Sequence, residues 1–416
     1  MSAQRSQAPF AATVAVLSIA AMLVIGQSFI TIPLMPSLGR TWSVSPESAA
    51  WATTVFAVAY AFGSLAGGPL SNRYGRRTIL TGAVAALAVA TALVPIATDL
   101  TWGLAVRALQ GVTAGSFVPM SYAYLAERVP ARRLPLALTT VGAAGGASAV
   151  ISQMEGQLIA SAFGWRTVFL ASAPLLAAAA LSVWRVLLPD PARHAPAAAS
   201  DVVAGHGLRI LASARLLPLL LVAVPTLGSL TALYTSVQLY GPPELVGDAG
   251  AMLSLRASAL PAMLLAVLAA PRLGRIPPLR RAAASLALAA IALLAAALAG
   301  DNSMALGAAL FVFVLAISTV GPAIVQAIGV SAGAAGATAM AVYGFLLNLG
   351  SGAGAQFPLA VGDLNGVAVG VAVLLAAGMG LIAIASRAAG RQARTTMVTG
   401  PASGPGATMS KQAAQQ

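Results

Sequence analysis

The chain has 416 residues, of which 59% are hydrophobic and 8% charged, and its mean hydropathy is +0.88. Soluble domains average about 45–50% apolar and about 25% charged residues, so this composition excludes an ordinary soluble protein. The net charge of +13 comes from arginines dispersed among short loops, which argues against a nucleic-acid partner. The absence of cysteine, with only two histidines, leaves almost no ligands for a metal site.

Apolar segments of about 20 residues recur along the chain, as expected of membrane-spanning helices. Alternating strands of a barrel are absent, so the sequence predicts an all-α polytopic membrane protein. The twelve predicted helices are 11–33, 48–69, 79–97, 102–126, 136–162, 167–187, 212–239, 249–271, 281–299, 304–328, 331–359 and 364–386.

The longest polar interruption divides these helices six and six. This predicts an N-terminal bundle over 1–187, a cytoplasmic linker over 188–211 and a C-terminal bundle over 212–390. The Gly-, Ser- and Gln-rich residues 391–416 are expected to be a disordered cytoplasmic tail. No small-residue cleavage site follows the first helix, so we expect that helix to be retained.

The basic residues gather in every second loop between the predicted helices. Of the 23 basic residues, 19 fall in segments on one side, and positively charged loops face the cytoplasm. The loops of the opposite side instead hold most of the acidic residues. The map therefore predicts an inner-membrane protein with both termini in the cytoplasm. The 19 residues are Arg5, Arg73, Arg76, Arg77, Arg128, Arg132, Arg133, Arg185, Arg193, Arg209, Arg215, Arg272, Arg275, Arg280, Arg281, Arg387, Arg391, Arg394 and Lys411.

A short basic stretch, Gly68-Pro-Leu-Ser-Asn-Arg-Tyr-Gly-Arg-Arg77, follows the second predicted helix. Glycine permits a tight reversal there, and the arginines hold that reversal on the cytoplasmic side. The stretch resembles the Gly-x-Leu-x-Asp-Arg-x-Gly-Arg-Arg loop of the major facilitator superfamily, although Asn72 stands where the family usually has Asp. The resemblance implies a conformational loop made of Gly68, Asn72, Arg73, Gly75, Arg76 and Arg77. Residues 271–281 are a degenerate second copy.

Two further stretches are similar to marks of proton-driven drug antiporters in that superfamily. Arg107-Ala-Leu-Gln-Gly111 resembles their Arg-x-x-Gln-Gly motif, and Gly164-Trp-Arg-Thr-Val-Phe169 resembles the stretch that opens their sixth helix. A third mark, Gly-Pro…Gly-Gly in helix 5, is replaced by Ile151-Ser-Gln-Met-Glu-Gly156. Glu155 thus occupies the first glycine of the final pair.

Three charged residues lie inside predicted helices: Arg107, Glu155 and Arg256. A charge there costs about 2.5–3.5 kcal/mol on insertion scales and usually faces a partner or a wet cavity. At 1.5 Å per residue all three lie about 9–11 Å below the outer surface. We hypothesise that Glu155 pairs with Arg256 to close an outer gate, and that Arg107 competes for Glu155 or tunes its pKa. The alternatives are a static packing pair, or arginines that extend to the headgroups.

Polar residues in the helices are candidates for a substrate cavity, and hydrogen bonding between helices is an equally good explanation for each of them. The family resemblance favours helices 1, 4, 7 and 10. The candidates are Gln27, Thr31, Gln110, Tyr234, Gln238, Gln326 and Asn348.

The resemblance implies a secondary active transporter that works by alternating access, with proton-coupled efflux of small lipophilic or cationic compounds as its activity. Proton-coupled uptake of a small metabolite is the alternative. The proton gradient would be the energy source, without a cofactor, and the expected partners are a small substrate, protons and membrane lipids around a monomer. A membrane enzyme would need a cluster of catalytic side chains, which the sequence lacks.

Overall fold

The computed structural model describes residues 9–398 apart from 131, 190–211, 247, 299–301 and 333–335. The side chains at 68, 69, 72, 135, 337 and 391–398 are not described. Most of the predicted linker 188–211 and tail 391–416 therefore lies outside the described residues. So does the side chain of Asn72.

The first half of the chain forms six helical spans, some of them interrupted. They are α1 (Phe10–Phe29) with η1 (Ile32–Leu34) and α2 (Met35–Trp42); α3 (Pro46–Ala49) with α4 (Trp51–Tyr74); α5 (Arg76–Leu93) with η2 (Val94–Ile96); α6 (Leu100–Gly115) with α7 (Phe117–Arg128); α8 (Leu134–Phe163); and α9 (Trp165–Val186).

The second half repeats this pattern. Its spans are α11 (Leu216–Leu221) with α12 (Ala223–Tyr240); α14 (Ala249–Ala257) with α15 (Ala259–Leu273); α16 (Pro278–Leu298); α17 (Ser303–Ala332); α18 (Gly336–Val361); and α19 (Leu364–Val398), with the short α13 (Pro243–Val246) in a loop. The described residues thus confirm an all-α protein with twelve spans. Helix α19 runs past Arg391, where the tail was expected to begin.

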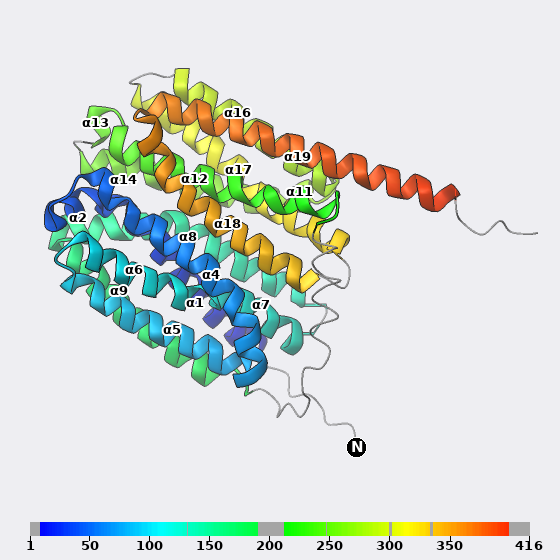
Figure 1. Ribbon diagram of the computed structural model, residues 1–416, viewed down its shortest axis with the longest axis horizontal. Coiled ribbons are helices and arrows are strands. Elements are labelled where there is room, and N and C mark those ends of the chain that lie inside the picture. Colours follow the sequence, from blue (N-terminus) through cyan, green and yellow to red (C-terminus); the bar gives the residue numbers. More distant parts are fainter. Residues whose placement is uncertain are drawn as a thin grey trace, which may run out of the picture.

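Each half is a bundle of six spans packed around one another (Figure 1). In the first half α1 packs on α8, α4 on α6, and α5 on α9. In the second half α12 packs on α18, and α16 packs on both α17 and α19. The halves meet mainly where α4 runs beside α18, and also where α8 meets α14 and α15.

Three spans predicted as continuous are interrupted at the same distance before a proline. α6 ends at Gly115, α11 at Leu221 and α14 at Ala257, four positions before Pro119, Pro225 and Pro261. Proline has no N–H and its ring clashes with the carbonyl four residues earlier, so the helix loses a hydrogen bond at that residue. By contrast, the helices that contain Pro174, Pro271, Pro322 and Pro358 stay continuous.

The first span corrects a predicted boundary. Residues 36–46 lie between the first two predicted helices, 11–33 and 48–69, and were expected to form a loop, but η1 and α2 continue the helical path to Trp42. α1 ends at Phe29, four residues before Pro33. Pro33 and Pro36 then stand in the first turn of η1 and α2, where a missing N–H costs nothing. Proline therefore redirects this span without ending it.

The basic stretch is also more helical than expected. α4 continues to Tyr74 and α5 starts at Arg76, so Gly75 alone makes the reversal. Its φ of 84° lies in the region that glycine favours, which confirms the predicted role of this glycine. Gly164, also at φ 84°, makes the equivalent reversal between α8 and α9.

Glycines allow the closest helix contacts inside each half. A Cβ on Gly111 would lie 2.3 Å from the Phe56 carbonyl oxygen, and one on Gly115 would lie 2.2 Å from that of Tyr60. The backbones of α4 and α6 could not approach so closely with larger residues. Gly228 and Gly354 make a similar contact between α12 and α18.

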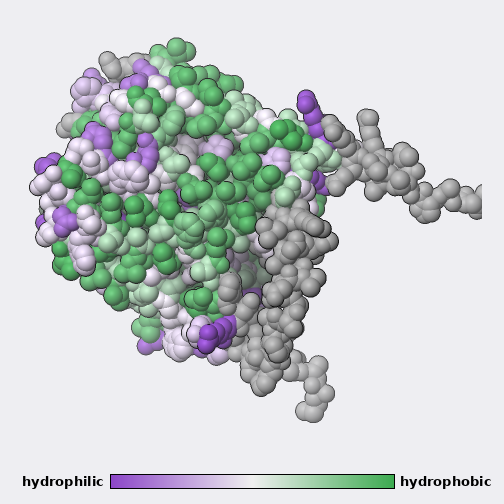
Figure 2. Space-filling model, in the orientation of Figure 1, coloured by the Kyte–Doolittle hydropathy of each residue, from purple (hydrophilic) through white to green (hydrophobic). Residues whose placement is uncertain are grey.

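The surface is that of an integral membrane protein. Ten helical segments are long and apolar enough to cross a membrane. Of the remaining two spans, α6–α7 is split at Ser116, and α18 carries Asn348 and several glycines. Large apolar side chains such as Phe62, Val89 and Ile291 are about 60% exposed. Hydrophobic residues cover the middle of the visible face, and hydrophilic residues gather towards its ends (Figure 2).

The two ends of the molecule differ in charge. We call one the acidic end, where the described loops and helix starts hold Glu47, Asp99, Glu244, Asp248 and Asp363. It includes α2, α13 and α14 at the left of Figure 1. We call the other the arginine end, where α4 meets α5, α7 meets α8 and α15 meets α16. This separation agrees with the sidedness that the sequence predicts.

Candidate functional site

Arg107 lies fully buried in the first half, on α6. Its Nε donates to the Ala52 carbonyl at 3.0 Å, one terminal nitrogen to Gln110 Oε1 at 2.8 Å, and the other to the Gln27 carbonyl at 2.8 Å. Its guanidinium carbon also lies 4.3 Å from the ring centroid of Phe56. Three helices are therefore joined through one cation, and each of its three nitrogens has an acceptor.

Gln110 extends this cluster. Its amide nitrogen donates to Thr91 Oγ1 at 2.8 Å and lies 3.5 Å from Gln27 Oε1. Because Gln110 orients the Arg107 guanidinium, both residues of the Arg-x-x-Gln-Gly stretch act together in the core of the first half. Gln27 and Gln110 were predicted to line the substrate cavity, and here they hold Arg107.

Glu155 borders a separate small cavity between α1, α8 and α9. The cavity has a volume of about 30 Å³ and is lined by Gln27, Ser152, Glu155 and Ser172 among apolar neighbours. One water molecule needs about 10–15 Å³, so the cavity is large enough for a water beside the carboxylate. Gln27 borders this cavity, and its backbone carbonyl accepts a hydrogen bond from Arg107, so Gln27 belongs to both the cavity and the Arg107 cluster.

Arg256 lies at the contact between the halves and is 1% exposed. Its two terminal nitrogens donate to the side-chain oxygens of Gln157 on α8 and Gln238 on α12. Gln157 also donates to the Ala249 carbonyl at the start of α14. No carboxylate is paired with Arg256 among the described residues, and its Nε has no partner there.

The predicted pairing of Glu155 with Arg256 is wrong for this conformation. The residue of α8 that meets Arg256 is Gln157, two positions further along. Residues two positions apart on a helix are separated by about 200° around its axis, so Glu155 and Gln157 cannot both face α14. Glu155 instead faces α1 and α9. Sequence reasoning missed Gln157, although its four-residue spacing from Gln153 places both on one face of α8.

The remaining predicted cavity residues are dispersed. Thr31 and Thr53 share a hydrogen bond of 2.9 Å within the first half. Gln326 accepts a hydrogen bond from Arg281 at 2.9 Å near the arginine end, and Asn348 donates to the Gly344 carbonyl of its own helix. Only Tyr234 and Gln238, one turn apart on α12, join the Arg256 region.

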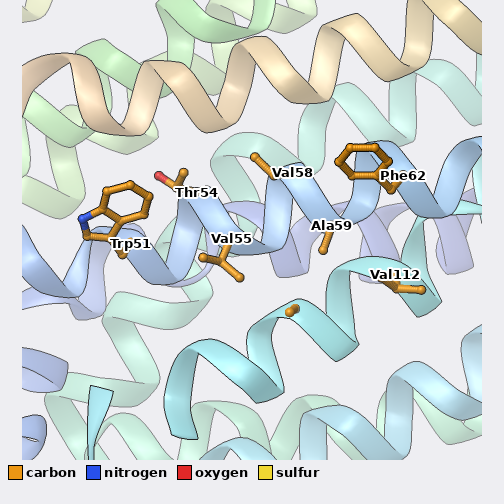
Figure 3. Close-up of a pocket in the computed structure, with 8 residues that line it drawn as sticks. Trp51, Thr54, Val55, Val58, Ala59, Phe62 and Val112 are labelled. Carbon is orange, nitrogen blue, oxygen red and sulfur yellow. The ribbon is translucent and has the colours of Figure 1, made fainter. Parts of the chain in front are cut away.

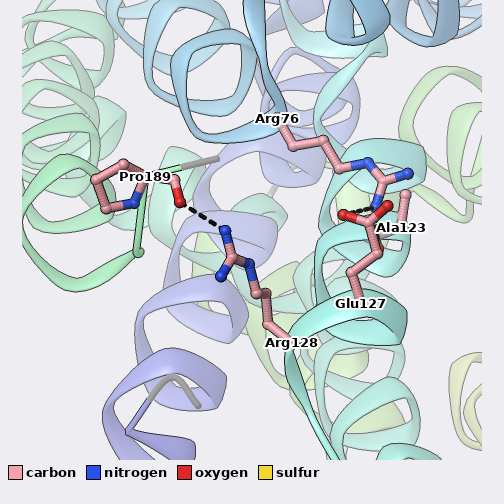
Figure 4. A network of polar contacts seen from close by, with 5 residues as sticks. All are labelled: Arg76, Ala123, Glu127, Arg128 and Pro189. Carbon is pink, nitrogen blue, oxygen red and sulfur yellow. Dashed lines mark hydrogen bonds and ion pairs between the residues drawn. The ribbon is translucent and has the colours of Figure 1, made fainter. Parts of the chain in front are cut away.

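The start of α5 is braced at the arginine end of the first half. Arg76 forms an ion pair of 2.5 Å with Glu127 and donates to the Ala123 carbonyl at 2.7 Å, while Arg128 donates to the Pro189 carbonyl (Figure 4). Arg77 donates to the Trp184 carbonyl. These contacts join α5, α7 and the end of α9 within one half, and Arg281 joins α15, α16 and α17 similarly in the other.

The halves are closed against each other towards the acidic end. Thr54 donates to the Gly352 carbonyl at 3.1 Å and accepts from Gln356 at 2.6 Å. Further along α4 and α18 from the acidic end, the rings of Phe62 and Phe345 pack edge to face, with their centroids 5.6 Å apart. Together with the Gln157–Arg256 contact, these hydrogen bonds between described residues of different halves all lie towards the acidic end.

An apolar groove of about 420 Å³ lies beside this contact, on the surface of α4 and α6. Trp51, Val55, Val58 and Phe62 line it from α4, and Val112 lines it from α6 (Figure 3). Trp51 is 45% and Phe62 59% exposed, so the groove opens towards lipid. It contains neither buried arginine.

Twelve spans in two six-helix halves, with polar clusters buried in an apolar interior, define a polytopic membrane protein. The model of the Major Facilitator Superfamily matches residues 17–355, and the chain belongs to that superfamily.

Curated relatives resemble parts of the chain. A multidrug resistance protein MdtG of Yersinia enterocolitica is 28% identical over 232 residues, which is 54% of this chain and 55% of the relative. An MdtG of Escherichia coli is 31% identical over 152 residues, 35% and 37% of the two chains. The niacin transporter NiaP of Acinetobacter baylyi is 26% identical over 137 residues, 33% and 31%. The matches span between about a third and about half of these relatives.

Solved structures share the fold over nearly the whole chain. An unoccupied, inward-facing bacterial homologue of the human lysosomal transporter Spinster has a TM-score of 0.69 at 16% identity, covering 91% of this chain and 98% of that one. A D-xylose–proton symporter has a TM-score of 0.66 at 15% identity, covering 88% and 96%.

Proposed function

We propose that this protein is a proton-coupled exporter of small lipophilic compounds and that Glu155 is its proton-coupling residue. One observation carries the proposal: Glu155 borders a cavity between α1, α8 and α9, and Gln27, which borders the same cavity, accepts a hydrogen bond from buried Arg107 through its backbone carbonyl. A carboxylate at membrane depth is costly, which favours a functional role for it.

Protonation of Glu155 changes the charge beside α1. Gln27 belongs to the cavity and also accepts a hydrogen bond from Arg107. A change of charge at Glu155 therefore acts on the contact between α1 and α6. A proton that binds one arrangement of the helices better than another shifts the population between them. In this way Glu155 couples protons to the movement of the halves, with the proton gradient as the energy source.

The closed contact towards the acidic end supports alternating access. We assign the acidic end to the outer face of a bacterial inner membrane and both termini to the cytoplasm, following the arginine distribution. Opening this end then requires the Thr54–Gly352 and Gln157–Arg256 hydrogen bonds to break.

The direction of transport is inferred from the relatives. The names of the MdtG proteins favour export. The names of the niacin transporter and the xylose–proton symporter favour the alternative, proton-coupled uptake of a small metabolite.

Inverted membrane vesicles distinguish the two directions. A proton antiporter concentrates a lipophilic fluorescent dye when the vesicle interior is acidic, whereas a symporter concentrates its substrate when the exterior is acidic. We expect accumulation with an acidic interior, which is lost when a protonophore collapses the gradient. Accumulation that requires an acidic exterior would show symport, and the proposal of export would give way to uptake.

A further inference from the structure

The Arg256 region contains buried polar atoms that have no partner in the protein. Among the described residues they include Arg256 Nε, Tyr234 Oη and Gln153 Oε1. Arg256 is 1%, Tyr234 3% and Gln153 0% exposed. Leaving a buried polar atom without a partner costs about 1–3 kcal/mol, so three of them in one region call for an explanation.

The three residues lie on faces that meet. Gln153 precedes Gln157 by four residues on α8, and Tyr234 precedes Gln238 by four on α12. Residues four apart share one face of a helix. Since Gln157 and Gln238 both bind Arg256, Gln153 and Tyr234 lie one turn from it, towards the middle of the molecule. Gln153 belongs to the first half, and Tyr234 and Arg256 to the second.

The charge of Arg256 is also uncompensated. Its hydrogen-bond acceptors among the described residues are two neutral amides. A buried cation without an anionic partner is strongly disfavoured, whereas an arginine–carboxylate pair gains roughly twice the energy of a neutral hydrogen bond. Arg107 also has only neutral acceptors, but each of its three nitrogens has one, whereas the Nε of Arg256 has none among the described residues. Of the two buried arginines, Arg256 is therefore the one with capacity left for a ligand.

We propose that Arg256, Tyr234 and Gln153 form a binding site for the carboxylate of the transported compound. The Arg256 Nε–H and the Tyr234 hydroxyl donate to the carboxylate. The Gln153 amide nitrogen donates to the Ala149 carbonyl, so its free side-chain oxygen accepts from a donor elsewhere on the transported molecule. The site rests on the proposed transport function and narrows its substrates to compounds with an apolar body and one carboxylate. Lipophilic cations, which the sequence led us to expect, are disfavoured beside Arg256.

Binding to the purified protein tests the site without any gradient. The probe is benzoate, compared with benzamide and benzylamine, which keep the ring and replace the carboxylate by a neutral or cationic group. Thermal unfolding and equilibrium dialysis of labelled benzoate are measured at constant ionic strength. We expect benzoate alone to bind and to raise the melting temperature of the wild type.

Variants locate the binding. Arg256→Gln should abolish benzoate binding, and Tyr234→Phe, which keeps the ring in place, should weaken it about tenfold. Tyr343→Phe removes a hydroxyl from another buried tyrosine and should leave binding unchanged. If Arg256→Gln does not fold, Tyr234→Phe still decides the question.

Three results would overturn the site: no benzoate binding, equal binding of benzamide, or full affinity in Tyr234→Phe. If inorganic phosphate raises the melting temperature as much as benzoate does, Arg256 binds any small anion. That result would overturn the assignment of the site to a substrate carboxylate. Benzoate binding without any transport would refute the proposed function and leave the site standing. Transport without benzoate binding would refute the site and leave the proposed function standing.

Discussion

Gln157 on α8 accepts a hydrogen bond from Arg256 on α14, and this contact joins the two halves of the protein towards the acidic end. Gln157 is neutral. The contact can therefore break without separating two opposite charges, which suits a gate that opens once in every transport cycle.

Two substitutions of Gln157 should shift the stability of this gate in opposite directions. Gln157→Glu gives Arg256 a carboxylate partner, and hydrogen bonds to charged groups contribute about 1.5–3 kcal/mol against about 0.5–1.5 for neutral ones. We expect a higher melting temperature and slower turnover. Gln157→Ala should lower the melting temperature. A shift in the same direction for both variants would show that the contact does not hold the gate.

A cross-link at the α4–α18 contact should lock the acidic end. The sequence contains no cysteine, so an introduced pair is unique. Thr54 and Gly352 share a hydrogen bond, and a Cβ on Gly352 would lie 3.3 Å from the Thr54 carbonyl oxygen. Oxidising a Thr54→Cys/Gly352→Cys protein should stop transport, and a reductant should restore it. The control pairs Thr54→Cys with Gly380→Cys, which has open space around it. Equal cross-linking of both pairs would contradict the contact.

Arg107 should not tolerate lysine. Its guanidinium reaches three acceptors on different helices, and an ammonium on a flexible chain cannot match that fork. Hydrogen bonds to charged groups contribute about 1.5–3 kcal/mol each, so we expect both Arg107→Lys and Arg107→Ala to unfold at lower temperature. Arg40→Lys, near the acidic end, serves as the control. Wild-type stability of Arg107→Lys would mean that the three hydrogen bonds are not formed together.

Gly115 should be sensitive to a single methyl group. Its Cβ would lie 2.2 Å from the Tyr60 carbonyl oxygen, so Gly115→Ala must push α4 and α6 apart. Overpacking of this kind costs about 1–3 kcal/mol. Gly82→Ala is the matched control, because nothing lies within 4 Å of that position. Thermal unfolding in detergent compares the two, and equal melting temperatures would exclude the close contact.

The fold followed from sequence because apolar length and arginine alternation are local signals. The number of spans and the two-half layout depend on these signals. The turn at Gly75 was also predicted correctly, as its positive φ shows. Interruptions at Gly115, Leu221 and Ala257 were missed, although each lies four residues before a proline, because other helices of this chain contain a proline and stay continuous. The prediction of a loop over 36–46 was wrong because Pro33 and Pro36 redirect the helical path without ending it.

The site was harder to predict because it depends on which face of a helix meets which neighbour. Charge and depth singled out Arg107, Glu155 and Arg256 correctly as residues inside spans. They did not reveal that Gln157 rather than Glu155 faces Arg256, since the two differ only by rotation around α8. The apolar sequence of α8 does not fix that rotation, because packing against α1 decides it.

The most direct test of the account is proton movement in proteoliposomes when substrate is added, with wild type, Glu155→Gln and Glu244→Gln compared at equal protein density. Glu244 is exposed on α13, so its neutralisation removes the same charge outside the interior. We expect substrate-driven proton movement for wild type and Glu244→Gln, and its loss in Glu155→Gln with substrate binding retained. Full proton coupling in Glu155→Gln would contradict it.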